Sequence, residues 1–414
     1  MTVAQPSIAR HVGSSRSRFL RLVCDRPAAA AAALVVATCV LIPGGLVSAG
    51  WPGDVIYYGH VGERIVNGQV PYHGFYLEYP PGAVPVFALP ALGPQRHYVF
   101  LFRVLMVLCA AGAAAAGVAA VERSGASRMT VVRAAVALGL APLVLGPLFL
   151  NRYDLWPALL VSLALLALVS NRARVAFGLL GLAVATKIYA VALVPVAAVH
   201  VYRHRGRREL VVAAAAFVAV GLAVTLPFAV VGFGGLGYSF YIQATRHLQV
   251  ESLGAQVLVA LDHLGLYHAQ AIEGAPGSRD LAGRSADVVG VLSSVVEVVA
   301  CLLVAFWYSR GPATPRRLLL ACAAALAAFV ALGKVLSPQY VVWLIPVVPL
   351  VAGAVGAWAL GFLALAVLAT QLLFYDSDGV ASLTSVSWLV LARNLVLVGL
   401  VVLLSRALVR SEPR

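Results

Sequence analysis

Charged residues are scarce in this chain of 414 residues. They make up 11% of it, while apolar residues make up 62%. A soluble domain carries about 25% charged residues and about 45–50% apolar ones. The chain therefore lacks the polar side chains that would cover a folded surface in water, and it is too apolar to stay disordered. A mean hydropathy of +0.93 predicts an integral membrane protein.

Cysteine is also rare, and lysine is nearly absent. The five cysteines lie in or beside apolar stretches without the spacing of metal ligands, so we interpret them as small apolar residues and expect neither a metal nor a cofactor. Arginine supplies every basic residue except Lys187 and Lys334. A net charge of +14 would suggest nucleic acid as the partner of a soluble protein. Because most arginines here fall in short loops between apolar runs, we expect contact with lipid headgroups and no nucleic-acid binding.

Apolar runs that could cross a bilayer recur along the chain. A helix needs roughly 20 apolar residues to cross, and the runs predict an all-α, polytopic membrane protein with about 12 transmembrane helices (about 10–13) in one domain, residues 28–405. The predicted spans are 28–49, 98–121, 129–149, 155–170, 175–187, 188–202, 209–231, 286–308, 318–333, 338–354, 356–374 and 384–405. Residues 175–202 could instead form one span. Residues 82–93 are apolar but short, which favours a re-entrant or interfacial piece.

The arginines indicate which side each loop faces. If the arginine-rich tail 1–27 is cytoplasmic, the cytoplasmic segments hold 20 of the 30 basic residues and only four of the 16 acidic ones. This positive-inside bias supports an even number of crossings, with the tail 406–414 also cytoplasmic. We therefore predict a protein of the cytoplasmic membrane whose long loops, 50–97 and 232–285, lie on the outer face.

The N-terminal region allows a second interpretation. Arginines followed by an apolar run and by Val47-Ser48-Ala49 resemble a signal peptide with a cleavage site. The run of about 22 residues is long for a signal peptide, whose apolar region has about 7–15 residues. We favour an uncleaved first span.

Asp54 is the candidate general base. It follows the first predicted span directly, in a loop rich in tyrosine, and a carboxylate placed there could accept a proton from a substrate. The alternative is an exposed aspartate that caps a helix beginning near Val55. Four aromatic side chains of the same loop could stack on a substrate or only pack the loop: Tyr57, Tyr58, Tyr72 and Tyr79.

Other polar residues cluster near the predicted outer ends of spans. Arg152 and Asp154 could pair with each other or face a cavity. Lys187 and Lys334 both fall in the outer third of a span, where an ionisable residue is a functional candidate and snorkelling is the alternative. The remaining candidates for substrate binding are Glu78, Arg246 and Gln339. Cations opposite a carboxylate suit the binding of a lipid-linked phosphate and the deprotonation of a hydroxyl.

The polar segments of the chain, taken in order, resemble those of the GT-C glycosyltransferases, and of glycosyltransferase family 87 in particular. The similarity covers about residues 28–400 and is carried by short motifs. The motifs are Asp54 with Tyr57-Tyr58, Asn67-Gly68-Gln69-Val70-Pro71-Tyr72, Glu78-Tyr79-Pro80-Pro81, Arg152-Tyr153-Asp154, Ala185-Thr186-Lys187, the stretch 246–252, and Ser337-Pro338-Gln339-Tyr340.

The resemblance implies a function. Family 87 contains polyprenol-phosphate-mannose-dependent mannosyltransferases, so it implies an inverting, metal-independent transfer from a polyprenyl-phosphate-linked sugar to a glycolipid or cell-envelope glycan. The acceptor side would be the non-cytoplasmic face of the bilayer. The family's acidic base maps to Asp54, and Glu63 and Glu78 are candidates for a second acidic residue.

Other functions fit the same pattern. A transporter or lipid flippase would use the same outward cavity without bond chemistry, although the sequence has no visible internal repeat of the kind common in transporters. A GT-C-like protein without activity, or a ligase that moves whole glycans from a lipid carrier, would share most of these features.

Overall fold

The computed structural model describes residues 25–42, 45–46, 53–274, 278–375, 383–384 and 386–411. Helices dominate this part of the chain, as predicted. They are α2 (Pro27–Leu41), α3 (Val55–Val66), α4 (Val84–Ala91), α5 (Tyr98–Arg123), α6 (Arg128–Leu145), α7 (Pro147–Leu150), α8 (Leu155–Val169), α9 (Ala173–Thr186), α10 (Val194–Ala244), α11 (Leu253–His263), α12 (Arg284–Arg310), α13 (Pro315–Leu332), α14 (Val341–Leu344), α15 (Gly353–Tyr375) and α17 (Ser387–Arg410).

Short elements complete this part of the fold. The 3-10 helices are η1 (Pro81–Ala83), η2 (Gln95–His97), η3 (Ile188–Leu193), η4 (Pro338–Tyr340) and η5 (Val348–Leu350). A small antiparallel ribbon pairs β1 (Ala271–Glu273) with β2 (Arg279–Leu281). The candidate signal-peptide site Val47-Ser48-Ala49 and most of the tail 1–27 lie outside the described residues.

Seven helices in the described ranges are long and apolar enough to cross a membrane. They are 95–123, 128–145, 188–244, 284–310, 315–332, 353–374 and 387–410. Further apolar helices are shorter, among them α2, α8 and α9. A multi-pass membrane protein is therefore supported, whereas the count of twelve spans stays a prediction.

Two predicted spans lie in one long helical range that is interrupted by kinks. The range 188–244 contains the predicted spans 188–202 and 209–231, and the backbone leaves the helical region at Gly206 and Gly232. Gly206 has a φ of 78°, a value that glycine adopts without strain. The chain therefore changes direction there, between the two predicted spans. The residues 175–202 also divide, because Lys187 is extended between α9 and η3.

The outer loops contain more helix than the sequence predicts. The glycine-rich start of the predicted loop 232–285 continues α10 as far as Ala244, beyond the break at Gly232. The remainder holds α11 and the β1–β2 ribbon. The short apolar piece 82–93 forms η1 and the eight-residue α4, in keeping with a segment too short to cross. At the C-terminus, α17 runs through Arg410, past the predicted boundary at residue 405.

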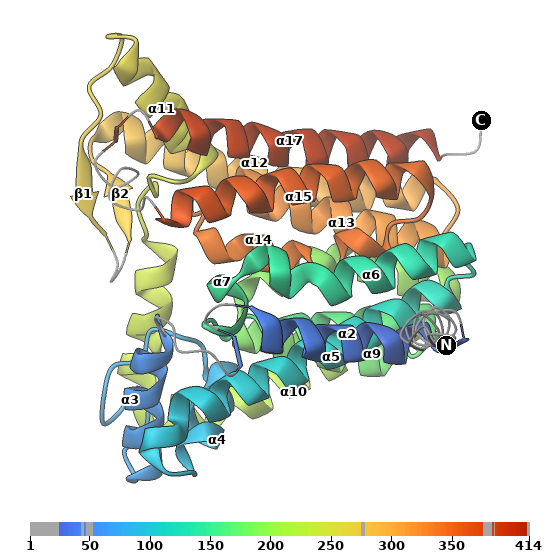
Figure 1. Cartoon of the computed structure of the whole chain (residues 1–414), viewed down its shortest axis with the longest axis horizontal. Coiled ribbons are helices and arrows are strands. Elements are labelled where there is room, and N and C mark those ends of the chain that lie inside the picture. The colour runs from blue at the N-terminus through green and yellow to red at the C-terminus, as the bar shows by residue number, and fades with distance from the viewer. Residues whose placement is uncertain are drawn as a thin grey trace, which may run out of the picture.

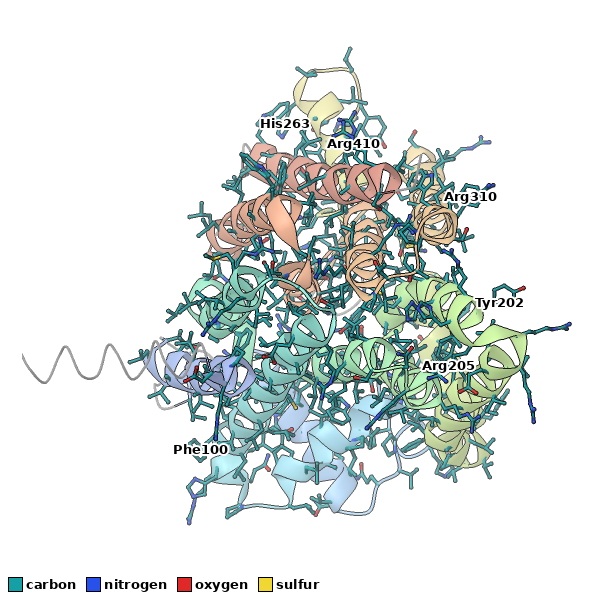
Figure 2. All side chains as sticks on the ribbon, turned by 90° about the vertical axis from the view of Figure 1, so that its right-hand side faces the viewer. Phe100, Tyr202, Arg205, His263, Arg310 and Arg410 are labelled. Carbon is teal, nitrogen blue, oxygen red and sulfur yellow. The ribbon has the colours of Figure 1, made fainter. Side chains whose placement is uncertain are left out.

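The helices form a bundle with two different ends (Figure 1). At one end, where α17 finishes, arginines from several turns bind backbone carbonyls of neighbouring turns. Arg205 donates to Asn171 O at 3.4 Å, Arg203 donates to Tyr308 O at 3.5 Å, and Arg317 donates to Leu408 O at 3.2 Å. We call this the arginine end. Figure 2 looks onto it and labels Arg205, Arg310 and Arg410.

The other end carries α3, α11 and the β1–β2 ribbon (Figure 1). Its turns are joined by contacts between residues far apart in sequence, such as Gln243 with Glu78 and Arg393 with Glu251. We call this the carboxylate end. Both lysines and Asp54 were predicted to share one side of the molecule, and their contacts place all three at this end.

Candidate functional site

Asp54 lies at the start of α3 and forms an ion pair with Arg152. Its side chain makes no hydrogen bond to the N-terminus of that helix, so the capping interpretation is wrong. The side chains of Asp54 and Arg152 are 34% and 15% exposed, which leaves the pair open on one side. The ion pair holds the Asp54 carboxylate in place with one side open to a substrate hydroxyl.

Asp154 pairs with Lys187 and not with Arg152, two residues before it. Lys187 Nζ lies 2.6 Å from Asp154 Oδ1, and the indole N–H of Trp343 donates to the same oxygen. Asp154 directly precedes α8, yet its side chain does not cap that helix. Burial lowers the pKa of the Arg152 guanidinium, and the nearby charge of Asp154 acts in the opposite direction.

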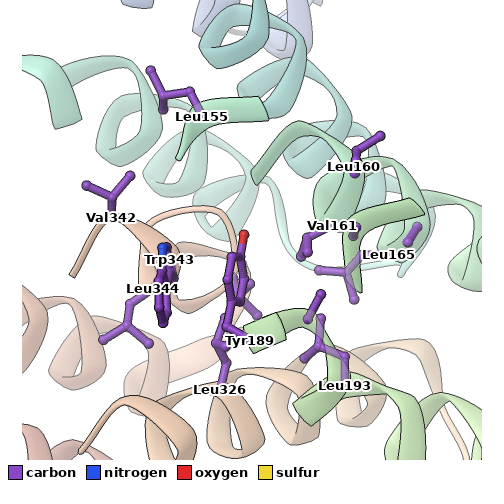
Figure 3. Close-up of a cluster of buried hydrophobic side chains, with 14 of the residues drawn as sticks. Leu155, Leu160, Val161, Leu165, Tyr189, Leu193, Leu326, Val342, Trp343 and Leu344 are labelled. Atoms are coloured by element: carbon purple, nitrogen blue, oxygen red, sulfur yellow. The ribbon is translucent and has the colours of Figure 1, made fainter. Parts of the chain in front are cut away.

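Aromatic rings cover Lys187. Its ammonium group lies 4.5 Å from the ring centroid of Tyr153 and 5.2 Å from that of Trp343, within the range of cation–π attraction. Trp343 itself stacks on Tyr189 at 4.4 Å and on Tyr340 at 3.7 Å. Figure 3 shows Tyr189 and Trp343 side by side above Leu326. We call Asp154, Lys187 and Trp343 the buried triad.

The tyrosines of the first outer loop divide into two groups. Tyr58 is 1% exposed and stacks on Phe87 at 4.6 Å, so it packs the loop. Tyr57 is 41% exposed and faces outward beside Glu78. Burial first, and then the charge of Glu78, raise the pKa of both Tyr57 and Tyr79, which keeps these hydroxyls protonated.

Glu78 forms a hydrogen bond with a residue near the C-terminal end of α10. Gln243 Nε2 donates to Glu78 Oε1 at 3.0 Å, and Tyr72 OH donates to Tyr79 O at 2.5 Å. Close backbone packing explains why this loop lies against α10, because a Cβ at Gly235 would stand 1.9 Å from Tyr72 O. Of the two candidates for a second acid, the structure brings Glu78 to the site, while Glu63 is exposed on α3.

Arg246 and Lys334 form a separate group of positive charges. Burial first, and then the charge of Arg246, lower the pKa of Lys334, and the charge of Arg246 also acts on Tyr340, so the three residues lie near one another. Lys334 Nζ donates to Ala244 O at 3.0 Å. The buried Nε of Arg246 has no hydrogen-bond partner, and Arg246 has no ion pair, among the described residues. Gln339 is half-buried in η4, next to Tyr340.

Three residues with buried polar contacts were not predicted from the sequence. Trp343 gave no signal, because a single tryptophan in an apolar run is ordinary. Arg103 and Arg393 did give one, since each is a charged residue inside a predicted span. Arg103 is 4% exposed and donates to Asn151 Oδ1 and Gly45 O, both at 3.0 Å. Arg393 is fully buried and binds Glu251 at 2.8 Å.

A metal site does not emerge from this geometry. In the part of the chain that the structure describes, no three His, Cys, Asp or Glu side chains gather closely enough to hold a metal ion.

The chain resembles a known group of enzymes over most of its length. The profile of glycosyltransferase family 87 matches residues 76–338. The chain belongs to glycosyltransferase family 87. No curated protein matches it. The family-87 segment contains Glu78, the buried triad's Asp154 and Lys187, and both Arg246 and Lys334.

Asp54 lies before the matched segment of this glycosyltransferase. Tyr57 and Tyr58 precede it as well, and Gln339 follows its last residue. Asp54 is joined to the family-87 segment through Arg152, which lies inside the match. Its place at the site therefore rests on this ion pair.

Proposed function

We propose that this family 87 glycosyltransferase is an inverting hexosyltransferase of the cytoplasmic membrane. It takes a sugar, mannose in this proposal, from a polyprenyl phosphate and passes it to a hydroxyl of a glycolipid or cell-envelope glycan. The observation that carries the proposal is the open ion pair of Asp54 with Arg152 at the carboxylate end. A carboxylate that reaches the surface, at the same end of the bundle as Arg246 and Lys334, suits a base-assisted attack next to a phosphate.

Asp54 accepts the proton of the acceptor hydroxyl in this mechanism. The acceptor oxygen forms a bond to the anomeric carbon, while the bond from that carbon to the phosphate oxygen breaks and its electron pair stays on the phosphate. The reaction is a single displacement, so the configuration at the anomeric carbon inverts. A retaining route would need two carboxyl groups about 5–5.5 Å apart around the sugar.

Arg246 and Lys334 stabilise the charge that grows on the departing phosphate. Four cations were candidates for this role, and the contacts favour two of them. Lys187 is balanced by Asp154, and Arg152 is balanced by Asp54. Arg246 has no ion pair in the described ranges. Lys334 donates to a backbone carbonyl, while the charges of Glu297 and Asp280 act on it without forming an ion pair within these ranges. Preorganised positive charge at a leaving group is among the largest contributions to catalysis.

Both termini are cytoplasmic and the site faces outward in this proposal. The arginine end supports that orientation, because positively charged segments are retained on the cytoplasmic side. The exposed ring of Tyr57 and the carboxylate of Glu78 would contact the sugar or the acceptor, beside the base.

The test is sugar transfer in membranes that contain the wild-type protein or Asp54→Asn. Radiolabelled polyprenyl-phosphate mannose is the donor, and lipids of the native host are the acceptors. Glu63→Gln is the matched control, because Glu63 is an exposed acid on the same helix. We expect labelled lipid with the wild type and the control, and none with Asp54→Asn. Absence of product from the wild-type protein with mannose and other polyprenyl-phosphate sugars would overturn the proposal.

A further inference from the structure

The buried triad is electrically neutral and mostly enclosed, with the Lys187 side chain 15% exposed and that of Asp154 2% exposed. The Oδ1 atom of Asp154 receives both Lys187 Nζ and the Trp343 indole N–H. The rings of Tyr153 and Trp343 lie over the ammonium group. A phosphate could reach Lys187 only by displacing the carboxylate that already balances it. These contacts argue against a direct role of Lys187 in binding the donor.

The triad joins three parts of the chain. Asp154 stands at the start of α8, Lys187 follows the end of α9, and Trp343 belongs to α14. Trp343 stacks on Tyr189 (Figure 3) and also on Tyr340, and the contact with Tyr189 fixes the third part against the second. Asp154 is thereby held by long-range partners and not by its own helix.

Arg152 lies two residues before Asp154 in the same turn. The turn is short, since α7 ends at Leu150 and α8 begins at Leu155. Any shift of Asp154 is therefore passed on to Arg152 and to its contact with Asp54. We propose that the buried triad is a positioning unit that sets the place of the Arg152–Asp54 pair, and that none of its three members contacts the substrate. This inference builds on the proposed function of Asp54.

Removal of one charge or of both charges distinguishes positioning from direct binding. Lys187→Met leaves the buried carboxylate of Asp154 without its cationic partner. Asp154→Asn leaves the ammonium group of Lys187 without its anionic partner. The double variant Asp154→Asn/Lys187→Met removes both charges, and a buried pair that is replaced as a whole is tolerated far better than a broken one.

Kinetics supply the first readout. A small misplacement of a catalytic group costs about 10²-fold in rate, so we expect each single variant to lower kcat by about that factor with little change in the KM for the donor. The double variant should recover most of the loss. If Lys187 bound the phosphate directly, the KM for the donor would rise, and the double variant would be as impaired as Lys187→Met. That result would overturn the inference.

Cross-linking supplies a second readout that needs no sugar donor. Asp54→Cys and Arg152→Cys are combined, and the reaction of the two thiols with a short bifunctional reagent reports the separation of the two positions in each background. The natural cysteines of the described ranges are buried and do not compete. We expect the cross-linking yield to fall with Lys187→Met and to return with the double variant. An unchanged yield in Lys187→Met would contradict the inference.

The cross-linking result separates this inference from the proposed function. If the wild-type protein makes no product with any donor, the proposed function fails while the yields still decide the role of the triad. Trp343→Phe is the conservative variant, because it keeps the stacked ring and removes only the donor to Asp154. A positioning role predicts an intermediate loss of yield with this variant.

Discussion

The arginine end and the carboxylate end use positive charge in different ways. At the arginine end, guanidinium groups bind backbone carbonyls where helices finish: Arg317 donates to Tyr308 O at 2.5 Å and to Trp307 O at 2.6 Å. At the carboxylate end, cations meet side-chain carboxylates, as in Lys187 with Asp154 and Arg393 with Glu251. The first arrangement satisfies the orphan carbonyls of helix C-termini, whereas the second places acids and bases beside one another.

The comparison indicates which end of the bundle can hold a catalytic base. An arginine whose donors are bound to carbonyls holds helices together and offers no base to a substrate. A carboxylate that reaches the surface beside a cation can take a proton from a substrate. Substitutions at the carboxylate end should therefore lower the transfer rate, whereas substitutions at the arginine end should change stability or have little effect.

Asp54→Asn should have the largest effect. The variant keeps the shape of the side chain and removes the base, so we expect the transfer rate to fall by about 10²- to 10⁴-fold, the usual contribution of general-base catalysis. Thermal unfolding in detergent should stay close to that of the wild type. Initial rates of label transfer at saturating donor measure the loss, and a rate within a few-fold of wild type would remove Asp54 from the mechanism.

Arg246→Gln should have the next largest effect. The substitution removes an unbalanced positive charge near Lys334 and Tyr340, and loss of one electrostatic contact to the transition state costs about 10²–10³ in rate. Steady-state kinetics with varied donor concentration give the value. Arg279→Gln, an exposed arginine at the same end, is the control. Equal effects of the two substitutions would show that Arg246 acts only through general surface charge.

Arg317→Met should affect stability and spare the rate. Arg317 is 4% exposed and joins the ends of α12 and α17 through Tyr308 O and Leu408 O. Each buried carbonyl that loses its donor costs about 1–3 kcal/mol, so we expect a lower melting temperature in detergent. Transfer per folded molecule should match the wild type. A selective loss of rate without a loss of stability would break the distinction between the two ends.

Arg174→Gln should have the smallest effect. Arg174 pairs with Glu209 at 2.9 Å at the arginine end, and the Arg174 side chain is 62% exposed. Exposed ion pairs gain little, because water screens the charges and both side chains lose mobility. We expect neither the melting temperature nor the transfer rate to change measurably. A clear loss of either quantity would mean that the exposed arginines of this end also carry a function.

The sequence predicts the helices better than it predicts the contacts of the site. Apolar runs and arginine positions are local signals, so they place helical segments and group Asp54 with the two lysines. The partners are long-range: Arg152 pairs with Asp54, 98 positions away in the sequence, and Asp154 pairs with Lys187. A pair between Arg152 and Asp154 was one of two alternatives that the sequence left open. The spacing of residues within one turn does not show which partner a charged side chain contacts in the folded chain.

Two arginines inside predicted spans indicate buried polar contacts from the sequence alone. Arg103 and Arg393 interrupt apolar runs, and a charge inside a span needs a buried partner. The structure supplies those partners in Asn151 and Glu251. The role of Trp343 could not have been predicted, because only the folded chain brings its indole to Asp154.

The most direct test compares Asp54→Asn with Arg317→Met in one experiment. Sugar transfer per folded molecule and melting temperature are measured for both variants and for the wild type. We predict that Asp54→Asn loses transfer and keeps its melting temperature, while Arg317→Met keeps transfer and loses melting temperature. Transfer by Asp54→Asn at the wild-type rate would contradict the claim that the carboxylate end holds the catalytic base.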